Sequence, residues 1–204
     1  MILPRRALLL TLGTAILPLP ALAQTVPDEA ARHIQHLADQ AFAVLQRDDL
    51  TLEGREAEFR RILSDGFDLA FVGRFVLGRY WDGVAPEQRD EYLELFSEFG
   101  LRTYAGRLGG YTGETFTVGG TRPAGEKDVI VATVIERSSG GAIDAEWRVR
   151  KVDAGYRIID VSVAGVSMAL NQREEFASVI TNHGVDGLLQ MLRARVSKVS
   201  VASN

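Results

Sequence analysis

The chain has 204 residues, contains no cysteine, and carries 23 basic against 27 acidic side chains, which gives a formal net charge of −4 at pH 7. The lack of thiols excludes cysteine catalysis, thiolate metal sites and disulfides, so the fold must be stabilised by packing. The acidic balance gives no electrostatic footprint for nucleic acid or an anionic membrane surface, and we expect no nucleic-acid partner.

The first 23 residues have the pattern of a secretory signal peptide. Two arginines precede an apolar run over residues 7–19, and Ala21 and Ala23 supply the small residues of a cleavage site. The run is too short, and too interrupted by proline, to span a membrane. We therefore expect residues 1–23 to be removed and 24–204 to form one soluble, exported domain. Its charge is −6, because the removed segment carries two arginines and no acid.

Apolar residues recur at helical spacing in four segments of the first half of the mature chain. We expect helices over 28–46, 53–63, 67–80 and 87–108. Gly73 and Gly78 lie inside the third segment, where each glycine costs a helix about 1 kcal/mol relative to alanine. Their presence predicts that another group approaches this helix closely.

After the fourth predicted helix, the apolar residues no longer recur at helical spacing. Segments rich in β-branched residues, separated by glycine-containing turns, predict an antiparallel meander over 115–120, 128–137, 142–152 and 156–166. Two further helices are expected from Asn171 and from Asp186. The pattern predicts an α+β domain, in which an antiparallel, twisted four-stranded sheet has one face covered by about six helices.

One residue merits a catalytic hypothesis. Asp160 shares strand parity with Tyr156 and Ile158 and could point into an apolar pocket as a general base. Such a base would suit a small-molecule isomerase or dehydratase built on a cone-shaped α+β fold. An isolated carboxylate lacks the second group that most such mechanisms need, and capping a loop or facing water is its more common role.

The remaining charged candidates are two histidines and two arginines. His33 and His36 have helical spacing but no third ligand nearby in the sequence, which predicts a solvated helix face and no metal site. Arg74 and Arg79 could meet an anionic head group at the mouth of a pocket. Pairing with nearby aspartates or water is the commoner role of helical arginines.

Several longer runs carry a family resemblance over nearly the whole mature chain. They are FDLAFVGRFVLGRYW, APEQRDEYLELF, RTYAGRLGGYTGETFTV, YRIIDVSVAGVSMALNQREEFASVI and GVDGLL, in that order. The chain resembles the MlaC family, also called toluene-tolerance or Ttg2D-type proteins. The resemblance implies a phospholipid carrier rather than an enzyme, with the acyl chains in an apolar cavity between sheet and helices and the head group in water.

The resemblance also implies a place and partners for the chain. It implies the periplasm of a Gram-negative bacterium and lipid exchange between an inner-membrane ABC-type transporter complex and an outer-membrane lipoprotein complex. Such exchange would maintain the lipid asymmetry of the outer membrane. Phospholipid would be the cargo, with no cofactor, no metal and no catalytic residue. Two alternatives remain open: the isomerase or dehydratase that uses Asp160, and a non-catalytic periplasmic adaptor whose apolar faces meet only each other.

On this resemblance, apolar and aromatic side chains of the helices and strands are candidates to contact lipid. They are Phe71, Phe75, Val76, Tyr80, Phe96, Tyr104, Trp147, Val149, Val161, Val163, Val166 and Met168. An open, dry cavity of the size required would be costly. We therefore expect the helices over 67–80 and 87–108 to close inward when cargo is absent.

Overall fold

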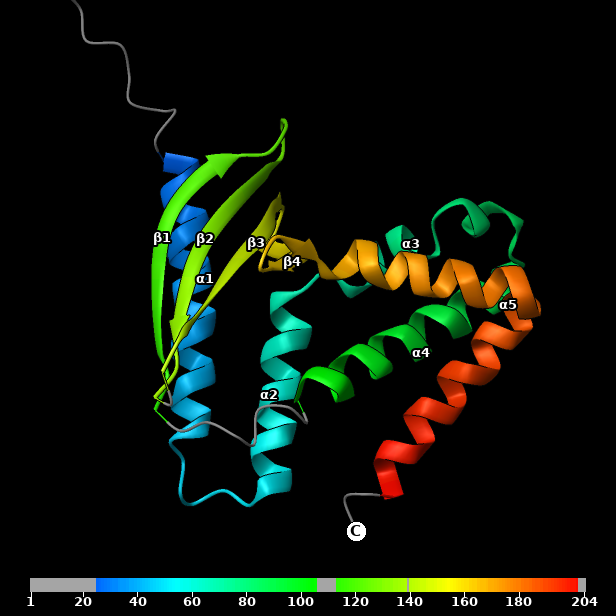
Figure 1. Cartoon of the computed structure of the whole chain (residues 1–204), viewed down its shortest axis with the longest axis horizontal. Helices are drawn as coiled ribbons and strands as arrows, with labels where there is room; N and C mark the ends of the chain where they lie inside the picture. Colours follow the sequence, from blue (N-terminus) through cyan, green and yellow to red (C-terminus); the bar gives the residue numbers. More distant parts are fainter. Residues whose placement is uncertain (1–24, 106–112, 139, 202–204) are drawn as a thin grey trace, which may run out of the picture.

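The computed structural model of the chain describes residues 25–105, 113–138 and 140–201 (Figure 1). The predicted signal peptide lies outside these residues. Within the described ranges, helices and one sheet follow in the order α1, α2, α3, η1, α4, β1 to β5 and α5, which is an α+β arrangement. No helix in these ranges is long and apolar enough to cross a membrane.

The first two helices form an antiparallel pair beside the sheet (Figure 1). They are α1 (Thr25–Leu45) and α2 (Leu52–Gly66), close to the predicted bounds. The hydroxyl of Thr51 begins α2 by accepting a hydrogen bond from the backbone N–H of Gly54 at 3.1 Å. The start of α1 packs against the sheet, where Ala30 and Ile34 are buried among strand residues.

The third helix, α3 (Leu69–Leu77), is shorter than predicted. Asp68 caps its start by accepting a hydrogen bond from the N–H of Phe71 at 2.9 Å. Gly78 ends it with φ 57° and ψ −125°, and the chain continues as the 3₁₀ helix η1 (Gly78–Gly83). The prediction of a helix through residue 80 was wrong because Gly78 takes a non-helical backbone conformation.

The fourth helix and the sheet follow. α4 covers Pro86–Ala105, and the end predicted near residue 108 lies outside the described residues. The strands pair in sequence order, each antiparallel to its neighbour. They are β1 (Thr115–Pro123), β2 (Asp128–Glu136), β3 (Ala142–Val152), β4 (Gly155–Val163) and β5 (Val166–Ser167). The predicted count of four strands was one too low, because the two-residue β5 folds back to pair with Val163 and Ser162.

A bulge in β4 changes the strand parity assumed for Asp160. Val149 pairs with Ile158, but the preceding Arg148 pairs with Asp160, so Ile159 is an extra residue in β4. Beyond the bulge, Val161 lies opposite Trp147 on the covered face. The parity argument that aligned Asp160 with Ile158 was therefore wrong, although Asp160 does lie on the wall of the apolar pocket described below.

The last helix, α5 (Met168–Val201), has two limbs. Its backbone is non-helical at Gly184, where φ is 68° and ψ is −179°. The two helices expected from the sequence correspond to these limbs, which make a sharp bend in Figure 1. A glycine at the bend fits a backbone with positive φ, which other residues adopt only with strain.

Buried apolar side chains form three clusters. The first joins α3, α4 and α5 around Tyr92, Phe96 and Phe176. The second joins the start of α1 to the sheet, and the third joins the end of α1, α2 and the end of α4. Figure 1 shows the same division, with the sheet, α1 and α2 on one side and α3, α4 and α5 on the other. The candidate site lies where the two sides meet.

Candidate functional site

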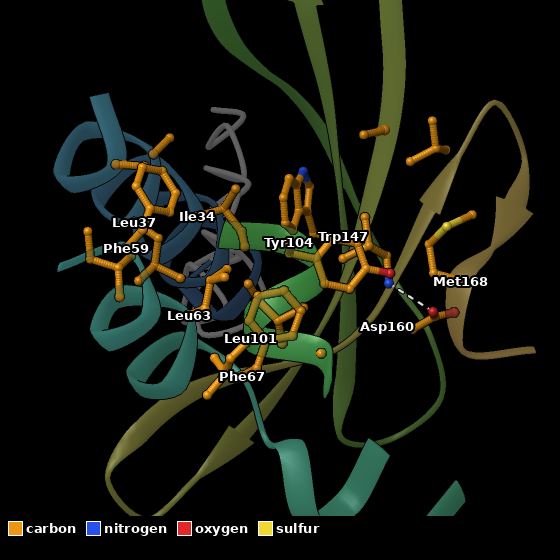
Figure 2. Close-up of a pocket in the computed structure, with 18 of the residues that line it drawn as sticks. Ile34, Leu37, Phe59, Leu63, Phe67, Leu101, Tyr104, Trp147, Asp160 and Met168 are labelled. Carbon is orange, nitrogen blue, oxygen red and sulfur yellow. Dashed lines mark hydrogen bonds between the residues drawn. The ribbon is translucent and has the colours of Figure 1, made fainter. Parts of the chain in front are cut away.

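A cavity of about 800 Å³ lies between α1 and α2, the covered face of the sheet, and α3 and α4. It is partly open to the surface, and Tyr104 on its wall is 47% exposed. Figure 2 shows Leu37 and Phe59 of the first two helices on one side of this space and Trp147 with Met168 on the other. The volume is near the upper end of the roughly 300–1,000 Å³ typical of ligand pockets.

The wall is apolar in every element that contributes to it. The apolar members are Ile34, Leu37, Ala38, Ala41, Phe42 and Leu45 of α1; Phe59, Ile62 and Leu63 of α2; Phe67, Leu69, Val72 and Val76 in and before α3; Phe96, Phe99, Gly100, Leu101 and Tyr104 of α4; Phe116, Ile135, Ile143, Ala145, Trp147, Ile158, Val161 and Val163 of the strands; and Met168 and Ala169 of α5. Such a wall offers dispersion contacts and a dry surface to hydrocarbon, but few directed hydrogen bonds.

The α1 part of the wall follows directly from helical periodicity. Its lining residues recur at intervals of three and four from Ile34 to Leu45, so they form one stripe along the helix. Ala38 and Ala41 lie in the middle of the stripe, where their small side chains leave space that a leucine would fill. This stripe is visible in the sequence as an apolar face of the helix expected over 28–46, but its residues are not among the candidates to contact lipid.

Trp147 presents an aromatic wall because its polar group is already bonded. Its indole N–H donates to the hydroxyl of Thr133 at 2.8 Å, and that hydroxyl donates to the carbonyl of Ala145 at 3.3 Å. The ring also packs edge-on against Phe116, with centroids 6.4 Å apart. A bound molecule therefore meets ring carbons rather than an unpaired donor.

The polar side chains on the wall are few, namely Glu114, Asp160 and Gln172 together with the ring substituents of Tyr104 and Trp147. Asp160 is occupied by structural hydrogen bonds. Its carboxylate accepts from the N–H of Val161 at 2.8 Å, the N–H of Ala169 at 3.1 Å and the hydroxyl of Ser167 at 2.6 Å. These bonds fasten the end of the sheet to the start of α5, which is the capping role rather than the role of a general base.

Glu98 of α4 links this helix to α2 beside the cavity. Its carboxylate accepts hydrogen bonds from Arg60 of α2 and Arg102 of α4. Burial raises the pKa of Glu98, but the hydrogen bonds from the two arginines outweigh burial and hold the pKa below its usual value. The ionised form of Glu98 is thus favoured, and its hydrogen bond from Arg60 links α2 to α4.

The structure brings together about half of the residues predicted to contact lipid. Val76, Phe96, Tyr104, Trp147, Val161, Val163 and Met168 all lie on the cavity wall. The others lie elsewhere. Phe71 and Phe75 line a separate hollow on the other face of α3, and Val149 is fully buried between the sheet and α1. Tyr80 shares a hydrogen bond with Thr181 at 3.1 Å, and Val166 is 54% exposed on β5.

The histidines and arginines do not line the cavity. His33 is half-buried against Tyr156, with ring centroids 6.0 Å apart, so the prediction of a solvated face was wrong for this residue; burial lowers its pKa. His36 is exposed and bonded to Gln40. Within the described ranges, no group of three or more histidine or acidic side chains is placed to hold a metal.

Comparison with known proteins places this geometry in a family. The family model described as MlaC protein matches residues 35–194, which includes every element from the body of α1 to the second limb of α5. The chain belongs to the MlaC family. Over 173 residues it is 23% identical to a protein of Haemophilus influenzae (strain ATCC 51907 / DSM 11121 / KW20 / Rd) named "Intermembrane phospholipid transport system binding protein MlaC", with 81% of each chain covered.

A solved structure shares the fold. The phospholipid-binding protein from Ralstonia solanacearum, determined in complex with a phospholipid, superposes with a TM-score of 0.74 at 24% identity. The match covers 84% of this chain and 98% of that one. The MlaC fold assigned from the sequence is thus confirmed, and the described cavity belongs to an architecture that the two proteins share.

Proposed function

We propose that this chain is a periplasmic phospholipid carrier, not an enzyme. It holds acyl chains in the cavity and exchanges lipid between an inner-membrane ABC-type transporter complex and an outer-membrane lipoprotein complex. The observation that carries the proposal is an apolar space of about 800 Å³ that the chain's own side chains leave unfilled. The names of the two related proteins, one for intermembrane phospholipid transport and one for phospholipid binding, support it. The signal-peptide pattern of residues 1–23 supports export of a domain over 24–204.

The energetics suit a carrier that must both take up and release its cargo. Two acyl chains with about 30 methylenes gain roughly 24 kcal/mol on leaving water, at about 0.8 kcal/mol per methylene. A bilayer interior offers the same gain, so transfer between membrane and cavity is close to neutral. The barrier lies in exposing the chains to water on the way. Docking complexes lower this barrier by giving the chains a continuous apolar path.

The distribution of charge at the cavity supports recognition of chains rather than head groups. Among the described residues of the wall, none is cationic, and the acidic ones are Glu114 and the fully engaged Asp160. A phosphate head group gains no ion pair by entering such a cavity and would lose its hydration. We infer that the head group stays in water and that selection depends on the number and length of the chains.

The proposal can be tested with a substitution that fills part of the cavity with a larger side chain. Ala38→Trp places a large ring on the cavity stripe of α1, and Ala43→Trp places the same ring on the exposed face of that helix. We expect phospholipid in organic extracts of the purified wild type and of Ala43→Trp, measured by mass spectrometry. Ala38→Trp should carry several-fold less lipid per chain while it keeps the same circular dichroism spectrum. Lipid-free wild type, or equal lipid content in the two folded variants, would overturn the proposal.

A further inference from the structure

A second hollow, of about 280 Å³, lies on the face of α3 opposite the cavity. Along α3, Leu69, Val72 and Val76 form one stripe that faces the cavity. Phe71, Arg74 and Phe75 form a second stripe that faces the hollow. The hollow is lined by Phe71, Arg74, Phe75, Gly78, Trp81, Asp82 and Arg173. Because α3 stands between the two spaces, a chain held in the cavity does not reach the hollow.

Two guanidinium groups line the hollow without an anionic partner. Arg74 lies over the ring of Trp81 at 5.5 Å, and Arg173 of α5 lies over the ring of Phe75 at 5.2 Å. Within the described part of the chain, neither arginine makes an ion pair or a hydrogen bond. Each guanidinium carries five N–H donors in a fixed fork, so the two present unused donors beside aromatic surface.

The backbone is built to admit Arg173. A Cβ at position 78 would lie 2.7 Å from the Nε atom of Arg173, which is closer than any real contact allows. Gly78 also has a φ of 57°, a conformation that favours glycine. The guanidinium of Arg173 therefore lies in the space that a side chain at position 78 would occupy.

We propose that this hollow, the Arg74–Arg173 site, is the docking site for an acidic segment of a partner protein, whose aspartate or glutamate carboxylate lies between the two guanidinium groups. Arginine forks match carboxylates in geometry and charge. Arginine, tryptophan and phenylalanine in one concavity are also the composition of energetically dominant protein–protein contacts. The hollow is about a third of the volume of the cavity, which suits one or two side chains of a peptide rather than a diacyl lipid.

Asp82 is the acid that faces the bound carboxylate in this arrangement. It lines the hollow, and one negative charge against two positive charges leaves the site positive on an otherwise acidic chain. Asp82 thus weakens the binding of any acidic ligand without abolishing it, and its neutralisation should strengthen binding. The site does not depend on whether the cavity holds lipid, so the two proposals can fail separately.

Fluorescence of Trp81 provides the test, because Trp81 and Trp147 are the two tryptophans of the chain and Trp147→Phe leaves only the one at the hollow. The probe is a short amidated peptide of four glutamates around one phenylalanine, compared with the same peptide made with glutamine. We expect a saturable fluorescence change with the glutamate peptide alone. Arg74→Gln and Arg173→Gln should each weaken its binding about tenfold or more. Asp82→Asn should strengthen it several-fold.

Arg32→Gln is the matched control, because Arg32 is an exposed arginine of α1 outside the hollow and its loss should leave binding unchanged. Equal responses to the two peptides, or unchanged binding in both arginine variants, would overturn the proposal. A response to phosphatidylglycerol vesicles but not to the glutamate peptide would also overturn it, since the occupant would then be a lipid head group. Phospholipid content in organic extracts should be the same for Arg74→Gln, Arg173→Gln, Asp82→Asn and Arg32→Gln as for the Trp147→Phe protein in which they are made, because none of these four residues lines the cavity.

Discussion

Asp128 is the charged side chain that the described fold buries, with 5% of the residue exposed. Its carboxylate accepts hydrogen bonds from Arg148 at 2.8 Å and from Arg150 at 2.7 and 3.0 Å. Burial raises the pKa of Asp128, but the hydrogen bonds from Arg150 and Arg148 outweigh burial and lower the pKa below its usual value. The carboxylate therefore favours the folded state while it is charged, and it holds β2 against β3 at one end of the sheet.

Asp128→Asn should lower the free energy of unfolding by about 2 kcal/mol at pH 7, because three hydrogen bonds from charged groups weaken and two arginines lose their counterion. Urea denaturation measures the difference. Since the folded pKa lies below the unfolded one, this stabilisation is complete above the unfolded pKa and is lost as the pH falls through the folded pKa. The difference in the free energy of unfolding between wild type and Asp128→Asn should therefore become smaller below about pH 4.

The exposed Asp153 in the turn between β3 and β4 supplies the control. Asp153→Asn should change stability by less than about 0.5 kcal/mol, as surface substitutions do. If Asp128→Asn were no more destabilising than this control, the buried carboxylate would not have the role assigned to it.

Apolar periodicity predicted the helices and strands that are defined by one apolar stripe of their own sequence. It missed the features that depend on contacts with neighbouring elements. The helices α1 and α2 and the four longer strands followed from spacing alone. The bulge at Ile159 leaves no mark in a run of β-branched residues, and β5 is too short to show a period. The end of α3 was signalled by Gly78, but the sequence did not show whether that glycine served close packing or a change of backbone direction. It serves both.

Gly78→Ala should lower the free energy of unfolding by about 1–3 kcal/mol, because alanine at this backbone conformation is strained and its Cβ displaces Arg173. Thermal unfolding followed by circular dichroism measures the change. The matched control is Gly100→Ala in the middle of α4, where an added Cβ meets no atom within 4 Å. That change should raise stability by up to about 1 kcal/mol through helix propensity alone. A similar gain in both variants would show that Gly78 is not required.

For the whole molecule, the cavity was harder to predict than the fold because both stripes of α3 are apolar. Phe71 and Val72 are adjacent and equally suited to a lipid surface, yet only Val72 faces the cavity. The packing of α5 on α3 decides which stripe turns inward, and that contact joins segments a hundred residues apart. Val149 is similarly apolar, but α1 covers it by bringing Ala30 and Ile34 against the sheet. Spacing identifies apolar faces, whereas tertiary contacts divide them between core and cavity.

The cavity walls differ in how firmly they are held. α3 and α4 share the largest buried cluster with α5, in which Phe176 contacts the rings of Tyr92, Phe96 and Phe99. The end of α1 and α2 are held by a smaller cluster and by the bridge from Arg60 to Glu98. Our expectation from the sequence gave the closing movement to the helices over 67–80 and 87–108. The packing instead points to the end of α1 and to α2.

Removal of cargo should therefore loosen one wall. An unfilled dry cavity of this volume would cost on the order of 20 kcal/mol at about 24 cal/mol per Å³, more than the roughly 5–15 kcal/mol that stabilises a domain. We expect delipidated protein to lose amide hydrogen-exchange protection over residues 38–45 and α2 relative to lipid-loaded protein. Residues 28–34, fixed to the sheet through Ala30 and Ile34, and the α3–α4–α5 cluster should keep theirs. Loss of protection in α3 and α4 with no change in α2 would instead assign the movement to the opposite wall.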